Sequence, residues 1–182
     1  MELFLVRHGE AASSWGESAD PGLSELGRQE AEAAAGQLMR YVDPDVLLIS
    51  SPLQRALETA QPLAKLLDQP VCEEDVFREI PSPVPLAQRQ GWLRQFMQQD
   101  WHEQSKELMA WRTATLSRLL ELRQPTVVFT HFLVINAVVG QVLERSETLH
   151  CWPANGSITR LRLRGDHLEL IALGEQIESV VN

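Results

Sequence analysis

The amino-acid sequence predicts an α/β fold, a three-layer α/β/α sandwich built on a mostly parallel sheet. Three short apolar runs, at residues 3–6, 46–50 and 126–130, have the composition of strands that are covered on both faces. Each run is followed by polar residues and then by apolar residues at helical spacing. Strands and helices that alternate in this way form a parallel sheet between two layers of helices.

The length of the chain predicts one domain. With 182 residues and no internal repeat, it is large enough to bury a core without disulfides or metal ions. We therefore expect a single domain over residues 1–182, with a helical, lid-like insertion at about residues 80–110. Three tryptophans fall in or beside this insertion; they either shape a lid over a site or, as the more ordinary explanation, pack amphipathic helices on the core: Trp92, Trp101 and Trp111.

The first two helices have clear start signals. A polar loop at residues 10–22 precedes Ser24, which is the expected N-cap of a helix that continues to about residue 41. The second helix is expected to be capped by Ser51, because Pro52 suits the first helical position and Gln54 completes a capping box.

The remaining elements follow from the same signals. Val71 and Cys72 predict a minor strand, and the proline-rich residues 77–85 predict an irregular loop. Two helices are expected near residues 86–100 and 103–122, and a third helix follows the strand at 126–130 and continues to residue 143. The segments SITRLRL and HLELIAL alternate apolar and polar residues around RGDH, which predicts an antiparallel hairpin.

Composition excludes several classes of function. A formal net charge of −9 and a pI near 5.0 argue against a nucleic-acid-binding protein. The stretch TVVFTHFLVINAVVGQVL approaches the length of a membrane span, but His131, Asn136 and Gln141 interrupt it, so no membrane segment is expected. Cys72 and Cys151 are too few for a disulfide framework. We expect a cytoplasmic protein.

Ionisable residues follow three of the expected strands. Arg7 and His8 end the first strand, Arg55 lies in the first helical turn after the second, and His131 follows the strand at 126–130. Each of these residues alone is more often structural than functional. Because the carboxyl ends of parallel strands meet at one sheet edge, where ligands bind in such folds, together they predict a cationic site.

The motifs LVRHGE, GLSELGRQEA, SSPLQRALETA and VVFTHFLVIN occur in an order that resembles the histidine phosphatase (phosphoglycerate mutase-like) superfamily. The resemblance implies the same fold and identifies His8 as the nucleophile that accepts a phosphoryl group. Arg7, Arg55 and His131 would surround the phosphoryl oxygens. Two guanidinium groups and a protonated histidine would supply the positive charge, so no metal and no other cofactor is expected; a zinc ion shared by the two histidines is disfavoured by the arginines.

The superfamily usually supplies a general acid from a loop between the second helix and the later histidine. Glu79 is our candidate, and Glu73, Glu74 and Asp75 are competing choices. Burial would raise the pKa of Glu79, whereas the neighbouring arginines would lower it.

Two positions depart from the superfamily pattern. Many members follow RHG with a threonine and a nearby asparagine, where this chain has residues 10–14 (EAASS). Phe132 stands where a glycine commonly follows the later histidine, and it either narrows a pocket or fills the core. Asn136 is left without an assigned role.

The resulting hypothesis is a metal-independent phosphatase that hydrolyses a small phosphorylated substrate through a phosphohistidine on His8. The alternatives are phosphoryl transfer of the phosphoglycerate mutase type, a phosphohistidine-protein phosphatase suggested by RHGEA, and a non-catalytic protein that binds a phosphorylated ligand. Neither the leaving group of the substrate nor an oligomeric state follows from the sequence.

Overall fold

A computed structural model describes residues 1–13 and 20–177 of the chain, and the expected polar loop at 10–22 lies partly outside these residues. Within them, six strands form one sheet in the order β3–β2–β4–β1–β5–β6. The strands are β1 (Glu2–Arg7), β2 (Leu47–Ser50), β3 (Cys72–Glu73), β4 (Thr126–Thr130), β5 (Ile158–Arg164) and β6 (His167–Ala172). The helices are α1 (Glu25–Leu38), α2 (Gln54–Leu67), α3 (Leu86–Phe96), α4 (Lys106–Leu120) and α5 (Phe132–Val142), with short 3-10 turns at Asp75–Phe77 and Trp101–Glu103.

The centre of the sheet is parallel, as predicted. Strand β4 lies between β1 and β2, and Val128 pairs with Leu5 on one side and with Ile49 on the other. Strand β3 extends the parallel part, whereas β5 and β6 add an antiparallel edge. Because β1, β2 and β4 run in the same direction, the residues that follow them emerge at the same edge of the sheet.

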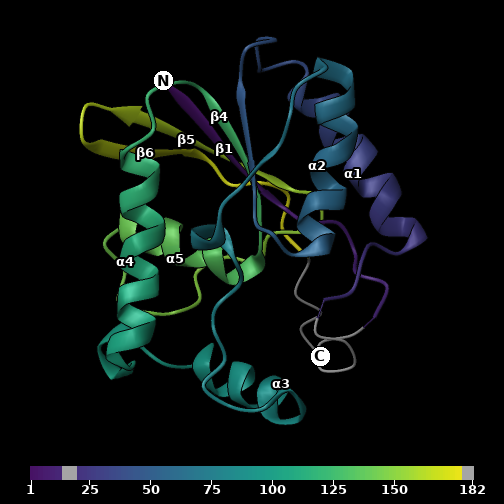
Figure 1. Ribbon diagram of the computed structural model, residues 1–182. Helices are drawn as coiled ribbons and strands as arrows, with labels where there is room; N and C mark the ends of the chain where they lie inside the picture. Colours follow the sequence, from purple (N-terminus) through teal and green to yellow (C-terminus); the bar gives the residue numbers. More distant parts are fainter. Residues whose placement is uncertain (14–19, 178–182) are drawn as a thin grey trace.

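Helices cover both faces of the sheet, which confirms the three layers. Alternate residues of β1 face opposite sides: Phe4 and Val6 pack with α1 and α2, whereas Leu3 and Leu5 pack with α4 and α5. Figure 1 shows α1 and α2 together on one side of the sheet and α4 and α5 on the other.

A third apolar cluster joins the segment around α3 to the start of α5. Phe96 and Trp101 pack there with Phe132, and Trp101 stacks on Trp111 with ring centroids 6.4 Å apart. The tryptophans thus pack helices together, which was the more ordinary of the two explanations. Figure 1 shows α3 apart from the sheet, at the bottom of the view. Its role as part of a lid stays a prediction.

Several local expectations are confirmed. Ser24 caps α1 and accepts a hydrogen bond from Gly27 N at 3.0 Å. The RGDH segment forms a two-residue hairpin turn, in which Gly165 adopts a positive φ of 61°. The long apolar stretch at 126–143 divides into β4 and the eleven-residue α5, and none of the helices in the described ranges is both long and apolar enough to cross a membrane.

Other expectations are wrong in detail. The helix α1 ends at Leu38 rather than near residue 41, and the segment near residue 103 forms a 3-10 turn before α4 begins. The capping box at Ser51 does not form. Helix α2 begins at Gln54, whose backbone N–H donates to Asp20 at 2.8 Å. Ser51 Oγ accepts from Leu53 N–H before the helix starts and also contacts His131.

Candidate active site

Strand β1 delivers Arg7 and His8 to the carboxyl edge of the sheet. The Arg7 N–H donates to Ser157 O at 3.1 Å, and the His8 N–H donates to Thr130 O at 3.0 Å. The two side chains are 9% and 5% exposed, so both are buried although both can carry charge. Backbone hydrogen bonds on both sides of β1 thus fix the backbone position from which these two side chains extend.

The glycine after His8 allows helix α1 to approach this segment closely. A methyl group on Gly9 would overlap the backbone of Gly27, and one on Gly27 would overlap the backbone of Glu10. Gly9 N–H also donates to Thr59 Oγ at 3.0 Å, and the same hydroxyl donates to Arg55 O at 2.6 Å. Thr59 therefore ties the first turns of α2 to the RHG segment.

The hydrogen bonds of His8 define its tautomer. Arg55 Nε–H lies 3.2 Å from His8 Nε2, and because an arginine can only donate, Nε2 carries the lone pair. The proton of the neutral ring is therefore on Nδ1, which donates to Gly9 O at 2.7 Å. Burial first, and then the charges of Arg55 and Arg7, hold the pKa of His8 well below its usual range. His8 is thus a neutral imidazole with an unprotonated nitrogen in the cationic cluster.

His131 completes the cluster from the end of β4. Its ring centroid is 5.2 Å from that of His8, and its Nε2 lies 2.7 Å from Ser51 Oγ. Burial, followed by the nearby His8, Arg55 and Arg7 side chains, keeps the pKa of His131 well below its usual range. In the ligand-free site these lowered pKa values favour neutral rings, so that the arginines carry the positive charge. The protonated histidine expected beside a bound phosphoryl group stays a prediction.

The guanidinium of Arg7 is bound to the protein through one nitrogen. Its Nη1 donates to Pro153 O at 2.7 Å, and its buried Nε has no hydrogen-bond partner among the described residues. Burial lowers the pKa of Arg7 to about 10, so the group remains charged at neutral pH. The Nε and Nη2 atoms form the side of an arginine that can bind two oxygens of one anion.

Glu79 lies beside this cluster, held by the backbone. Its two oxygens accept hydrogen bonds from Ile80 N at 2.9 Å and from Leu133 N at 3.4 Å. Burial raises the pKa of Glu79, although these backbone bonds and the charges of Arg55 and Arg89 oppose the rise. A carboxyl group with a raised pKa has the property that a general acid requires.

The three competing carboxylates have other roles or positions. Glu74 forms a two-point ion pair with Arg118 at 2.7 Å, and Asp75 pairs with Arg78 at 3.2 Å. Glu73 is an exposed residue of the edge strand β3. The charge of Arg55 lowers the pKa of Glu79, so this carboxyl group lies within the electrostatic reach of the cluster.

The structure adds two residues that sequence reasoning missed. Arg89 of α3 donates to Ile80 O at 3.0 Å, and its charge lowers the pKa of Glu79, Arg55 and His131. Asp20 lies 3.9 Å from Arg55 Nη1 and caps α2. No motif marks Arg89, because its position depends on how α3 packs against the rest of the chain.

The departures from the superfamily pattern have structural explanations. The Glu10 carboxylate accepts from Ser24 Oγ at 2.6 Å and so supports the start of α1, while Ser14 lies outside the described residues. Phe132 is 3% exposed and lies under the guanidinium of Arg7, with 5.1 Å between Arg7 Cζ and the ring centroid. The fully buried Asn136 binds Phe132 O, Cys151 O and two backbone N–H groups, so it joins α5 to the segment that contains Pro153.

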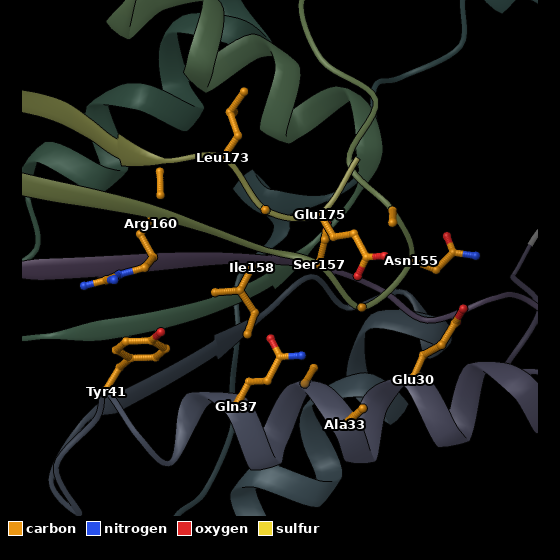
Figure 2. A pocket seen from close by; sticks show the side chains of 15 residues that line it. Glu30, Ala33, Gln37, Tyr41, Asn155, Ser157, Ile158, Arg160, Leu173 and Glu175 are labelled. Atoms are coloured by element: carbon orange, nitrogen blue, oxygen red, sulfur yellow. The ribbon is translucent and has the colours of Figure 1, made fainter. Parts of the chain in front are cut away.

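A separate hollow of about 470 Å³ opens between α1 and the β5–β6 hairpin. Figure 2 shows Gln37 and Tyr41 on one side of it and Ile158 and Arg160 on the other. Arg160 already stacks on Tyr41 at 4.4 Å and pairs with Glu2, and none of the five candidate site residues lines this hollow. The candidate active site is therefore the charged cluster. In the described ranges, no three His, Cys, Asp or Glu side chains gather as a metal site would require.

Fold and site together define an α/β protein in which two histidines and two arginines from three strand ends meet at one sheet edge. The chain belongs to the histidine phosphatase superfamily, branch 1, whose family model matches residues 3–176. This confirms the resemblance that the motifs suggested.

Named relatives include several phosphatases. The chain is 40% identical over 81 residues to a glucosyl-3-phosphoglycerate phosphatase of Mycolicibacterium vanbaalenii, a match that covers 42% of this chain and about a third, 35%, of the relative. A phosphoserine phosphatase of Entamoeba histolytica, solved with 3-phosphoglyceric acid, is 25% identical with a TM-score of 0.74 over 96% of this chain and 97% of that one. A mycobacterial glucosyl-3-phosphoglycerate phosphatase, solved with VO3, has a TM-score of 0.72 at 24% identity over 94% and 97% of the two chains.

Proposed function

We propose that this protein is a phosphatase that hydrolyses a small phosphomonoester through a phosphohistidine intermediate on His8. The observation that carries the proposal is the geometry around His8, whose ring lies 5.2 Å from that of His131 and whose Nε2 faces Arg55 Nε at 3.2 Å. Arg7 Nε and His131 Nδ1 are two of eight buried side-chain polar atoms that have no partner among the described residues. Buried polar atoms are seldom left unpaired. Both belong to the cluster around His8, and a phosphoryl group has the charge and the oxygens to satisfy them.

The first chemical step transfers the phosphoryl group to the protein. His8 Nε2 attacks phosphorus, so a P–N bond forms while the ester P–O bond breaks. Arg7 and Arg55 stabilise the charge on the phosphoryl oxygens, and the protonated Glu79 gives its proton to the leaving oxygen. The products of this step are the free alcohol and phosphohistidine.

The second step returns the protein to its starting state. Glu79, now a carboxylate, removes a proton from a water molecule as the water oxygen attacks phosphorus and the P–N bond breaks. Inorganic phosphate leaves, His8 is again neutral, and Glu79 is again protonated. The arginines supply all the positive charge in this scheme, so it requires no metal ion.

The names of the relatives support a small phosphorylated metabolite as the substrate. Those relatives are called phosphatases of glucosyl-3-phosphoglycerate and of phosphoserine. Glu10 of the RHGEA motif, which suggested a phosphoprotein substrate, contacts Ser24 and Glu30 at helix α1, and these contacts give it a structural role. We place the activity in the cytoplasm, because both cysteines, the exposed Cys72 and the buried Cys151, are free thiols.

Replacement of His8 tests the proposal directly. His8→Ala should abolish hydrolysis of p-nitrophenyl phosphate and should remove the acid-labile phosphorylated species that rapid quenching traps in the wild-type protein. His102→Ala, at a histidine whose side chain is 75% exposed, is the control and should keep full activity. Wild-type turnover in His8→Ala would refute the proposal. Phosphate binding without turnover in the wild type would favour a binding protein, and a phosphorylated product from 3-phosphoglycerate would favour a mutase.

A further inference from the structure

Phe132 makes a contact that the superfamily pattern does not supply. It follows His131 at a position where glycine is common, and it is buried at 3% exposure. Its ring lies against the guanidinium of Arg7, with 5.1 Å between Arg7 Cζ and the ring centroid. A charged guanidinium over an aromatic face is an attractive arrangement, and it is stronger when the pair is withdrawn from water.

The contacts of Arg7 fix the plane of its guanidinium. The hydrogen bond from Nη1 to Pro153 O, at 2.7 Å, fixes one atom but leaves rotation about that bond. The ring of Phe132 restricts this rotation, because it lies beside the same group, 5.1 Å from Arg7 Cζ. Together the two contacts leave Nε and Nη2 as the free edge, and Nε is the buried nitrogen without a partner.

A second aromatic residue packs against the Phe132 ring. Trp152 packs on Phe132 with ring centroids 5.5 Å apart and a tilt of 59°. Asn136 donates to both Phe132 O and Cys151 O at 3.0 Å, so the first turn of α5 and the segment 151–153 are tied together. The same two segments therefore supply the ring and the carbonyl that hold Arg7.

We propose that Phe132 is a positioning residue that orients Arg7 to bind two phosphoryl oxygens with its Nε and Nη2 edge. The proposal rests on the proposed function, because it assigns the anion that Arg7 binds. A leucine at position 132 would fill most of the same space but offers no aromatic face. Arg7 would then keep its charge and lose its fixed plane.

The test compares Phe132→Leu with Phe96→Leu. Both phenylalanines belong to the same apolar cluster, but Phe96 packs on Trp92 and Trp101 rather than on Arg7. Inhibition by inorganic phosphate and by vanadate measures the affinity for the anion, and thermal unfolding measures stability. We expect both variants to lose stability and Phe132→Leu alone to bind the anions about 5- to 30-fold more weakly, with a matching rise in KM.

Trp152→Leu keeps the proposal testable if Phe132→Leu fails to fold. Trp152 is 46% exposed, so its replacement endangers folding less, and we expect anion binding roughly 2- to 5-fold weaker. The inference is overturned if Phe132→Leu and Trp152→Leu, or whichever of the two folds, bind the anions as tightly as the wild type while Arg7→Gln binds them more weakly. If the wild type binds no phosphate, or if Arg7→Gln binds it equally well, the proposed function itself fails.

Discussion

The Nε–H of Arg55 donates a hydrogen bond, 3.2 Å long, to His8 Nε2, the nitrogen that carries the ring's lone pair. The same arginine therefore selects the tautomer of His8 and covers the atom that must attack phosphorus. The bond has to break before Nε2 can react. An entering phosphoryl group offers Arg55 a stronger, charged acceptor, so binding of the substrate and exposure of the nucleophile are the same event.

Loss of Arg55 should change the pH dependence as well as the rate. Its charge lowers the pKa of His8, so Arg55→Gln should raise that pKa. His8 attacks only when neutral, and the acid side of the kcat/KM profile should therefore move to higher pH. We also expect a loss of roughly 100- to 1,000-fold at the optimum, since a phosphoryl contact is removed. Arg28→Gln, at an exposed arginine of α1, is the control and should leave the profile unchanged.

Replacement of Glu79 should depend on the leaving group. Glu79→Gln cannot donate a proton, so hydrolysis of an alkyl phosphate should fall by about 100- to 10,000-fold. The loss should be much smaller with p-nitrophenyl phosphate, whose leaving group needs little protonation. Glu74→Gln, which breaks the ion pair with Arg118, should behave as the wild type with both substrates. Equal losses on the two substrates would show that Glu79 has a structural role rather than that of the acid.

Arg89 should set the upper limit of the pH profile. Because its charge lowers the pKa of Glu79, Arg89→Gln should raise that pKa further. Glu79 acts as an acid only while protonated, so the alkaline side of the kcat/KM profile should move to higher pH. Arg94→Gln changes an exposed arginine of the same helix and should have no such effect. If Arg89→Gln and Arg94→Gln have the same pH profile, Arg89 does not affect the catalytic acid.

The strand ends could be predicted from the sequence because their signals are local. An apolar run followed directly by Arg7 and His8, or by His131, places these side chains at a sheet edge, and this does not depend on how the helices pack. Glu79 was harder to predict, since four acidic residues lie within seven positions of one another. The ion pairs of Glu74 and Asp75 separate them, and an ion pair with Arg118, 44 residues later, has no sequence signature.

Ser51 shows why local rules fail at the site. Its sequence context is that of a helix cap, but its hydroxyl lies 2.7 Å from the Nε2 of His131, 80 residues later. Helix α2 begins only at Gln54, whose N–H donates to Asp20, so Ser51 does not lie at the helix start. Its oxygen accepts from Leu53 N–H outside the helix, and its hydroxyl also contacts the buried histidine, which no local pattern predicts. Arg89 could not be predicted as a site residue for a similar reason, since its position depends on packing between elements.

The Ser51 hydroxyl should control the tautomer of His131. Ser51 Oγ accepts from Leu53 N–H at 3.3 Å and lies 2.7 Å from His131 Nε2. We expect the serine to donate its proton to Nε2, which places the ring proton on Nδ1. Ser51→Ala should populate the other tautomer and weaken phosphate binding roughly 3- to 10-fold. Ser50→Ala removes the neighbouring hydroxyl, which donates only to Ser51 O, and should do neither. Nitrogen-15 NMR of the imidazole reports the tautomer; an unchanged spectrum in Ser51→Ala would contradict this role.

Two glycines of α1 should respond to alanine in opposite directions. A methyl group on Gly36 has no heavy atom within 4 Å, so Gly36→Ala should stabilise the helix by about 0.5–1 kcal/mol. A methyl group on Gly27 would overlap the backbone of Glu10, and Gly27→Ala should destabilise the protein by roughly 1–3 kcal/mol. Because the displaced segment follows His8 directly, activity should fall in Gly27→Ala and stay constant in Gly36→Ala. Thermal unfolding and hydrolysis of p-nitrophenyl phosphate measure the two effects, and a Gly27→Ala protein as stable and active as the wild type would show that α1 does not hold the nucleophile in place.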